Sequence, residues 1–231
     1  MSNDIPYRVE RSANRHSRAA FRNGEIVIRL ARRLSAQEQR EHIETLLRRM
    51  HRQLERDRSR VCIDPFGPLL QGASEHTAVL DNGRLIPVRL QPAPSLRHCV
   101  TDGTLAVGVA ADTDRKQLHR RLWRALGELL QPTVAEWVHD LNAATLQVPV
   151  DRVRLRLATT RWGSCSANGS IMLNTALLFL PSDLCEYVII HELAHRVHAN
   201  HSSRFWNVIA KWCPDYKEQR AMLKAYRLPV V

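Results

Sequence analysis

The sequence has no long uninterrupted run of apolar residues and no pair of cysteines at C-x-x-C spacing. Without a run of about 20 apolar residues, no membrane-spanning helix is predicted, and we expect no membrane partner. The polar segment from Met1 to Arg18 also lacks the apolar core of a secretory signal. We therefore expect a cytoplasmic protein.

Cysteine is scarce and odd in number, which argues against a disulfide framework and against a cysteine-based zinc module. The five cysteines are Cys62, Cys99, Cys165, Cys185 and Cys213. We interpret Cys165 as a packed, reduced thiol and not as a nucleophile.

Lysine is missing from the first 60 residues, which hold 15 Arg and 8 Asp or Glu, a balance of +7. The whole chain carries a formal charge of +11. A basic face attracts nucleic acids and acidic proteins. Aromatic residues that would stack on bases are few there, Tyr7 and Phe21. A solvated basic surface is therefore the favoured interpretation, and nucleic-acid binding through this Arg-rich region stays open as an alternative.

What the sequence does contain is the run His191-Glu192-Leu193-Ala194-His195, followed by His201. On a helix, two histidines four residues apart lie about 40° apart around the axis and about 6 Å apart along it, so they can share one metal ion. H-E-x-x-H is the spacing of zinc sites in which the glutamate is the general base. Ser182 is positioned to cap this helix, and apolar residues recur at near-helical spacing along it. These residues are Leu184, Val188, Ile189, Leu193 and Val197.

A catalytic zinc usually takes three protein ligands and leaves one position for water. His198 and His201 are the candidates for the third ligand. His198 lies about 10.5 Å along a helix from His191, and three ligands along one straight helix fit a tetrahedron poorly. His201 reaches back if the chain turns, and Asn200 tolerates the left-handed conformation that often ends helices. The geometry favours His201 and leaves His198 as the alternative.

The chemistry follows from the predicted ion. Zinc lowers the pKa of bound water to about 7 and polarises a substrate carbonyl. Glu192 would accept the proton of the zinc-activated water and pass it to the leaving amine, so we expect peptide-bond hydrolysis. The sequence leaves open which residue stabilises the oxyanion. The candidates are Arg161, His198, Arg204 and Tyr216.

The segment before this helix reads as strands. Val153 to Ala158 alternates apolar and basic residues, Asn168-Gly169 is a hairpin turn signal, and Ile171 to Asn174 is the returning strand. An edge strand here would pair with an extended substrate, although a purely structural hairpin explains the same pattern equally well.

Several motifs together resemble the YgjP-like zinc metallopeptidases, which are related to the SprT-like proteases. The resemblance is dense from residue 161 to about 225 and looser from about 18 to 160. It is carried by Arg161-Trp162-Gly163-Ser164-Cys165-Ser166, Gly169, Ile171, Leu173-Asn174, HELAH, Asn200-His201-Ser202, Arg204-Phe205-Trp206 and Pro214-Asp215-Tyr216-Lys217. It implies one Zn²⁺ held by His191, His195 and His201, with Glu192 as the catalytic residue. Thr175-Ala176 and His198 depart from the family pattern and bear on substrate preference.

We expect an α+β fold in which a zincin-like HExxH helix lies beside an antiparallel hairpin or sheet. Residues 1–110 are predicted to form a β-rich lobe with one helix, and residues 111–231 the catalytic region. In the first lobe, Asn23-Gly24 joins strands Arg18 to Arg22 and Glu25 to Leu30, and Ser35 to Glu38 is a capping box. In the second, helices near 114–130 and 133–144 are predicted to be separated at Pro132.

The leading function is therefore a zinc-dependent metallopeptidase acting on a protein or peptide substrate. Two alternatives remain: a nucleic-acid-associated, SprT-like protease that acts on DNA-bound proteins, and a zinc hydrolase of a small amide.

Overall fold

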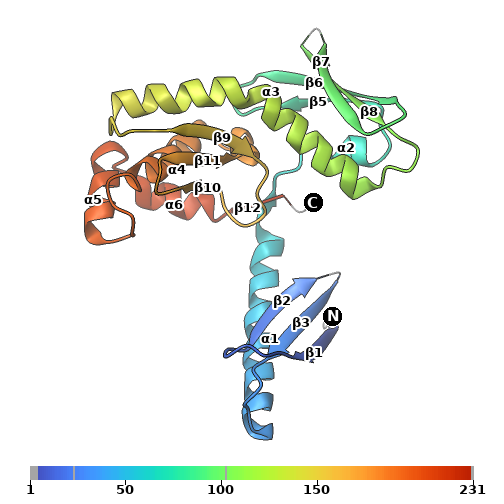
Figure 1. Cartoon of the computed structure of the whole chain (residues 1–231), viewed down its shortest axis with the longest axis vertical. Coiled ribbons are helices and arrows are strands. Elements are labelled where there is room, and N and C mark those ends of the chain that lie inside the picture. Colours follow the sequence, from blue (N-terminus) through green and yellow to red (C-terminus); the bar gives the residue numbers. More distant parts are fainter. Residues whose placement is uncertain (1–4, 23, 102, 230–231) are drawn as a thin grey trace. The chain divides into compact units, whose positions relative to one another are not determined.

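The structure is a computed structural model that describes residues 5–22, 24–101 and 103–229. The chain is α+β and divides into two compact units, Met1–Arg60 and Val61–Val231. Figure 1 shows the order of their helices and strands. The boundary expected near residue 110 falls inside the second unit. Residues 61–110 share one apolar core with residues 111–229, and this core joins Val107 to Leu122 and Leu193.

The first unit is a three-stranded sheet packed on one long helix. Its elements are β1 (Tyr7–Arg11), β2 (Arg18–Arg22), β3 (Glu25–Leu30) and α1 (Ala36–Ser59). The strand order is β1-β3-β2, with β1 parallel and β2 antiparallel to β3. Ile26, Ile28 and Leu30 pack with Met50 of α1. The predicted β2–β3 hairpin is confirmed, with Gly24 at φ +84°, while Asn23 lies outside the described residues.

The start of α1 also agrees with its sequence signal. Ser35 accepts a hydrogen bond from the Glu38 backbone N–H at 3.3 Å, and the Glu38 carboxylate accepts one from the Ser35 N–H at 2.7 Å. The predicted capping box is therefore confirmed.

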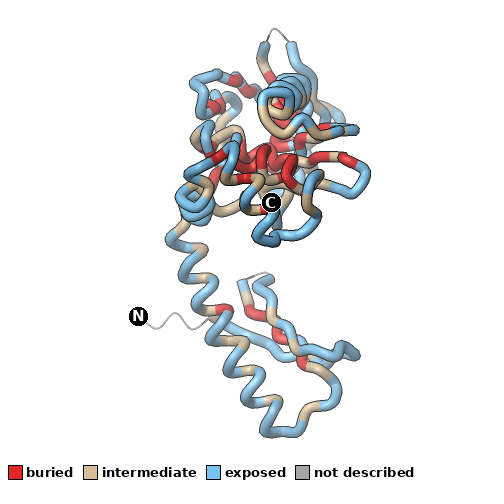
Figure 2. The backbone as a smooth tube through the Cα atoms, turned by 90° about the vertical axis from the view of Figure 1, so that its left-hand side faces the viewer, coloured by how far each residue is buried: buried red, intermediate tan, exposed pale blue. Residues whose placement is uncertain are grey.

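The second unit begins with a four-stranded sheet of order β5-β6-β8-β7. Its elements are β4 (Val61–Cys62), α2 (Gly67–Leu70), β5 (Glu75–Val79), β6 (Leu85–Pro92), β7 (Arg97–Thr101) and β8 (Thr104–Val109). α3 (Arg115–Ala144) packs on this sheet through residues such as Trp123, whose ring meets those of Phe66 and Phe179 edge to face. Figure 2 shows the buried positions of this unit gathered in its interior.

α3 is a single helix that continues through Pro132, so the prediction of two helices separated there is wrong. Proline removes one backbone donor and crowds the preceding turn, which kinks a helix without always ending it. Leu130, Val134 and Val138 are all buried in the same core, and this burial holds the two halves in one helix. Figure 1 shows α3 changing direction along its length.

A second sheet of three strands follows, β9 (Arg152–Arg156), β10 (Gly163–Cys165) and β11 (Ser170–Asn174), in the order β10-β11-β9. The returning strand β11 is antiparallel to β10 and parallel to β9. The predicted turn at Asn168-Gly169 therefore connects β11 to Gly163–Cys165, a strand that the sequence pattern had not indicated. The earlier strand β9 lies on the other side of β11.

The chain closes with helices and one short strand: η1 (Thr175–Phe179), α4 (Ser182–Ala194), α5 (Ser203–Trp212), α6 (Tyr216–Leu223) and β12 (Tyr226–Arg227), which pairs with β4. α4 lies against β10 and β11. Within the described ranges, none of the helices combines the length and the apolarity that crossing a membrane requires.

Candidate metal centre

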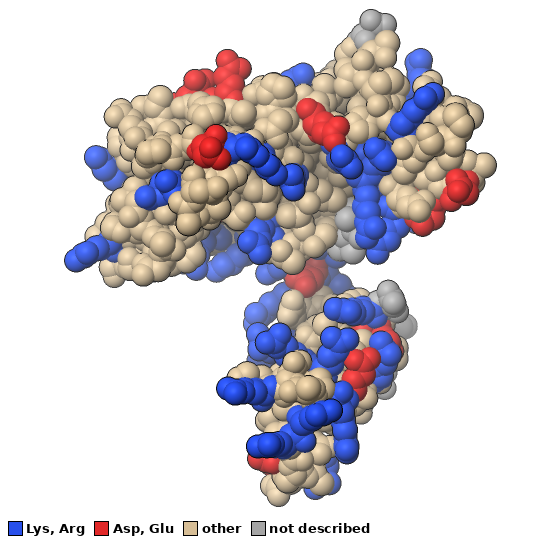
Figure 3. Space-filling model, in the orientation of Figure 1, with Lys and Arg blue, Asp and Glu red and all other residues tan. Residues whose placement is uncertain are grey.

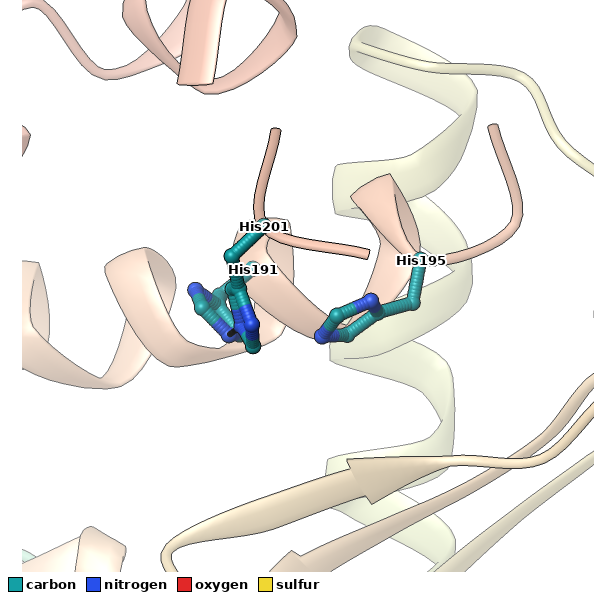
Figure 4. A group of neighbouring side chains, drawn as sticks. All are labelled: His191, His195 and His201. Carbon is teal, nitrogen blue, oxygen red and sulfur yellow. Dashed lines mark hydrogen bonds between the residues drawn. The ribbon is translucent and has the colours of Figure 1, made fainter. Parts of the chain in front are cut away.

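The three histidines that the sequence singled out lie together. His191 is in the last turn of α4, His195 is the residue that ends this helix with helical backbone angles, and His201 directly precedes Ser202, the N-cap of α5. Their ligand nitrogens all lie within 4.8 Å of one another, and Nε2 of His191 is 3.1 Å from Nε2 of His201. Figure 4 shows the three rings pointing toward one another.

The chain returns to His201 by a different route from the one predicted. Asn200 is not left-handed, because Gln147 is the one non-glycine residue with positive φ among the described residues. Instead, the backbone tightens directly after α4. The N–H groups of Arg196 and Val197 donate only three residues back, to the carbonyls of Leu193 and Ala194, at 2.9 and 3.0 Å. These short-range bonds end α4 early, and a loop then carries His201 back.

The start of α4 also differs from the prediction. Pro181 is its N-cap, and no side-chain hydrogen bond caps it, so Ser182 is not the predicted cap. The apolar positions Leu184, Val188, Ile189 and Leu193 are buried, whereas Val197, beyond the helix end, is 46% exposed. The predicted stripe is therefore confirmed over the helix itself.

His198, the alternative ligand, is outside the histidine cluster. Its backbone carbonyl lies 3.3 Å from Nδ1 of His195. An imidazole whose Nδ1–H donates to a carbonyl presents its Nε2 lone pair, the arrangement that orients metal-binding histidines. His198 thus helps to orient the His195 ring through its backbone carbonyl.

Burial favours neutral imidazoles here. Burial, together with the charges of the neighbouring His195 and His201, lowers the pKa of His191 to about 4. Burial also lowers the pKa of His195, although hydrogen bonds to the carbonyls of His198 and Ala199 oppose this. At neutral pH both rings are unprotonated, which is the form that binds a metal.

An aromatic wall from α5 and α6 supports the histidines. The His191 and His195 rings lie 5.0 and 4.7 Å from the ring of Phe205, and the His201 ring stacks on Trp206 at 5.7 Å. Trp206 stacks in turn on Tyr216 at 5.3 Å. The signal for a supporting role was the run Arg204-Phe205-Trp206 in the family-like motifs.

Glu192 is 6% exposed, and its side chain lies against Gly163 of β10. Burial raises the pKa of its carboxyl to about 7, against the opposing effects of the Arg161 charge and of the Cys165 backbone N–H. A Cβ atom at position 163 would lie 2.6 Å from Glu192 Oε1 and 2.7 Å from Cγ. Gly163 is therefore required for this close approach, a role that the sequence reasoning missed.

Asn174 holds the segment that connects β9 to β10. Its fully buried side chain donates to the carbonyls of Ala158 at 2.6 Å and Arg161 at 3.0 Å, and its backbone N–H donates to the Trp162 carbonyl at 2.8 Å. These bonds fix residues 157–162, which we call the linker, around the end of β11. Arg161 and Gly163 are thereby placed beside Glu192.

The three histidines and Glu192 line a cleft of about 380 Å³. β10 forms its opposite wall, and the linker residue Arg161 also lines it. Of the four oxyanion candidates, only Arg161 is among the lining residues. Cys165 lines the cleft as a free thiol, and burial raises its pKa, so it is not a thiolate nucleophile at neutral pH.

A histidine pair with an intervening buried glutamate, set under an edge strand, is typical of metallopeptidases. The family described as "YgjP-like, metallopeptidase domain" matches residues 15–226. The chain therefore belongs to the YgjP-like metallopeptidase family and is a hydrolase.

Two solved structures are similar to parts of the chain. The metallopeptidase zymogen of Pyrococcus abyssi abylysin is 33% identical, over 40% of this chain and 99% of that one, with a TM-score of 0.35. The metallopeptidase zymogen of Methanocaldococcus jannaschii jannalysin is 18% identical, over 38% of this chain and 92% of that one, with a TM-score of 0.33. No curated protein matches the chain.

Proposed function

We propose that the protein is a zinc-dependent peptidase in which His191, His195 and His201 hold one Zn²⁺ and Glu192 is the general base. The observation that carries this proposal is the cluster of three imidazoles within 4.8 Å, facing the same cleft as a buried glutamate. Ligands on a tetrahedral zinc, with Zn–N bonds of about 2.0–2.1 Å, are separated by about 3.3 Å. The 3.1 Å between Nε2 of His191 and Nε2 of His201 is close to this value.

When bound, zinc supplies Lewis acidity, which lowers the pKa of water and polarises a carbonyl. The carboxylate of Glu192 accepts a proton from the attacking water and delivers it to the nitrogen of the leaving amine. Gly163 and the Cys165 backbone N–H keep the carboxylate in place for this transfer.

The different surroundings of the two sheet edges favour β10 as the strand that binds substrate. At the other edge, the side-chain amide of Gln131 donates to the Val153 carbonyl at 2.9 Å and accepts from the Leu155 N–H at 2.6 Å. These are outward-facing groups of β9, so the Gln131 amide takes the place of a neighbouring strand and blocks this edge. β10 is the edge that lines the cleft, and an extended peptide that pairs with it would pass the histidines.

Metal content and hydrolysis test the proposal. Mass spectrometry is expected to find about one zinc per chain in the parent and in His198→Ala, and much less in His201→Ala. Glu192→Gln is expected to keep the metal and to lose at least 99% of hydrolysis, since general-base catalysis contributes about 10²–10⁴-fold. A His201→Ala protein that keeps its zinc contradicts the ligand set, and an active Glu192→Gln protein contradicts the base.

Substrate class needs a separate comparison. A peptidase is expected to cleave unfolded proteins in preference to short blocked amides, whereas a small-amide hydrolase shows the reverse. Nucleic-acid binding by the Arg-rich first 60 residues and a cytoplasmic location stay predictions from the sequence.

A further inference from the structure

A second cavity, of about 940 Å³, lies between α3 and β9 and is closed by the linker residues Leu157 to Thr160. Arginines from two elements line it, Arg120 and Arg124 from α3 and Arg154 and Arg156 from β9. The only acidic residue among its lining residues is Glu128. We call this the basic cavity.

Most of this positive charge is not neutralised within the protein. Arg124 pairs with Glu128 at 2.8 Å, and His98 also contacts the Glu128 carboxylate, at 2.9 Å. Among the described residues, no Asp or Glu oxygen lies within 4.0 Å of a side-chain nitrogen of Arg120, Arg154 or Arg156. Clustered charges of one sign in a concave site raise the local concentration of counter-ions, so the basic cavity favours an anionic occupant.

The basic cavity adjoins the metal cleft through the linker. Thr160 lines the basic cavity, and its neighbour in the chain, Arg161, lines the cleft. β10 and β9 are the two edges of one three-stranded sheet, so they are separated by two strand spacings, about 10 Å. A substrate strand paired with the free edge of β10 lies one further spacing out, about 15 Å from β9, and an extended peptide spans this distance with four or five residues at about 3.3 Å per residue.

We propose that the basic cavity is an accessory substrate site that takes aspartate and glutamate side chains a few residues away from the scissile bond. This inference rests on the proposed peptidase function. The arginine guanidinium binds carboxylates with two parallel hydrogen bonds, and the three arginines without an acidic partner, Arg120, Arg154 and Arg156, select for an acidic segment. The protein therefore prefers acidic polypeptides as substrates.

The shape of the site favours a polypeptide over a nucleic acid. The arginines line one open cavity, whose wall also includes the apolar residues Trp123, Leu155 and Leu157. Nucleic-acid strands instead bind along grooves that follow the backbone over several nucleotides, with exposed aromatic side chains for stacking. Trp123 is fully buried and offers no such surface.

Paired fluorogenic peptides test the preference. The two peptides of a pair share the residues next to the scissile bond and differ three to six residues away, where one has Asp and Glu and the other Asn and Gln. The parent enzyme is expected to cleave the acidic peptide with about tenfold higher kcat/KM, because two partly shielded ion pairs together give about this factor. The preference is expected to fall as salt is raised.

The double variant Arg154→Gln/Arg156→Gln is expected to remove the preference and to leave cleavage of the neutral peptide unchanged. Arg152→Gln is the matched control, because Arg152 belongs to the same strand but does not line the basic cavity. Equal cleavage of both peptides by the parent overturns the proposal, and so does a preference that survives the double variant or disappears in the control.

A binding measurement separates this proposal from the peptidase function. Fluorescence anisotropy with the Glu192→Gln protein reports binding without hydrolysis. The Glu192→Gln protein is expected to bind the acidic peptide more tightly than the neutral one. This difference is expected to disappear when Arg154→Gln and Arg156→Gln are added, and that result supports the basic cavity even if no peptide is cleaved. Equal binding of both peptides overturns it. If a single-stranded oligonucleotide of equal charge binds more tightly and depends on the same arginines, the cavity is a nucleic-acid site and the proposal is wrong.

Discussion

At the residue scale, the position of Glu192, the candidate base, depends on the absence of a side chain at Gly163. Glu192 is buried against β10 because Gly163 leaves the space that a Cβ would fill. The His195 ring is similarly held by two neighbours, the His198 carbonyl and the Phe205 ring. The chemistry of the site is therefore set as much by its supporting residues as by the H-E-x-x-H run.

Gly163→Ala tests this dependence. Its new Cβ would lie 2.6 Å from Glu192 Oε1, so the carboxylate has to move. We expect kcat to fall about 100-fold, the typical cost of a misplacement of about 1 Å at a reacting group. Zinc content is expected to stay at the parent level, because the substitution does not touch the histidines.

Gly67→Ala is the matched control, since nothing lies within 4 Å of a Cβ built there. It is expected to keep the parent kcat. A fully active Gly163→Ala protein would show that Glu192 does not need its present position.

At the element scale, the two edges of the β10-β11-β9 sheet have different surroundings. Gln131 of α3 occupies the outward hydrogen-bonding groups of β9, whereas β10 lines the cleft. Asn174 fixes the linker between these two strands. The sheet thus presents one strand to the cleft, and α3 blocks the other edge.

Gln131→Ala leaves the Val153 carbonyl and the Leu155 N–H without their partner. We expect the free energy of unfolding, measured in urea, to fall by about 1–3 kcal/mol, the cost of leaving a buried polar group unsatisfied. The Leu155 amide is expected to exchange its hydrogen faster.

Gln131→Glu serves as the comparison, because its carboxylate still accepts from Leu155 but no longer donates to Val153. Its second carboxylate oxygen faces the Val153 carbonyl oxygen, so the stability is not restored, but the Leu155 amide is expected to exchange its hydrogen as slowly as in the parent. An alanine variant as stable as the parent, with an unchanged Leu155 exchange rate, would contradict the edge-blocking role.

At the scale of the whole molecule, the Val61–Val231 unit packs around one apolar core, and a polar contact joins its first residues to α3. Asp64 Oδ1 lies 3.1 Å from His119 Nε2 and accepts from the Phe66 N–H at 3.1 Å. In the other unit, the arginines are interleaved with acids, as in the ion pairs of Arg8 with Glu25 and of Arg29 with Glu10. Figure 3 shows both signs of charge on the face of that unit that it draws.

The Asp64 contact predicts how stability depends on pH. Burial acts to raise the pKa of Asp64, but the hydrogen bond and charge of His119 outweigh it, and the net pKa is lowered. An aspartate with a lowered folded-state pKa stabilises the fold above its unfolded pKa, and this contribution is lost as pH falls through the folded value. Asp64→Asn is therefore expected to lower Tm by about 2–4 °C at pH 7, the shift for roughly 1 kcal/mol in a domain of this size.

The difference in Tm between Asp64→Asn and the parent is expected to shrink when differential scanning calorimetry is repeated at pH values below the ordinary aspartate pKa of about 3.9, as the pH falls toward the lowered folded-state pKa of Asp64. Asparagine retains an acceptor for the Phe66 N–H, so the comparison isolates the charge. A difference that stays constant from pH 7 to pH 3 would contradict this account.

The sequence by itself determined the features that depend on neighbours along the chain. The Ser35–Glu38 capping box, the β2–β3 hairpin and the helix that carries His191 and Glu192 follow from spacings of two to four residues, since such spacings fix which groups meet within a turn or hairpin. The fold class and the family were also predictable, because the motifs from Arg161 to Lys217 are dense and specific.

Only the tertiary structure decided which distant residues meet. The unbroken course of α3, the space at Gly163 and the basic cavity all depend on side chains separated by tens of residues. Their positions are set by packing against a shared core, and packing overrides local preference, as it does for Pro132 inside a helix that is buried on both sides of it. No periodicity in the sequence records such contacts.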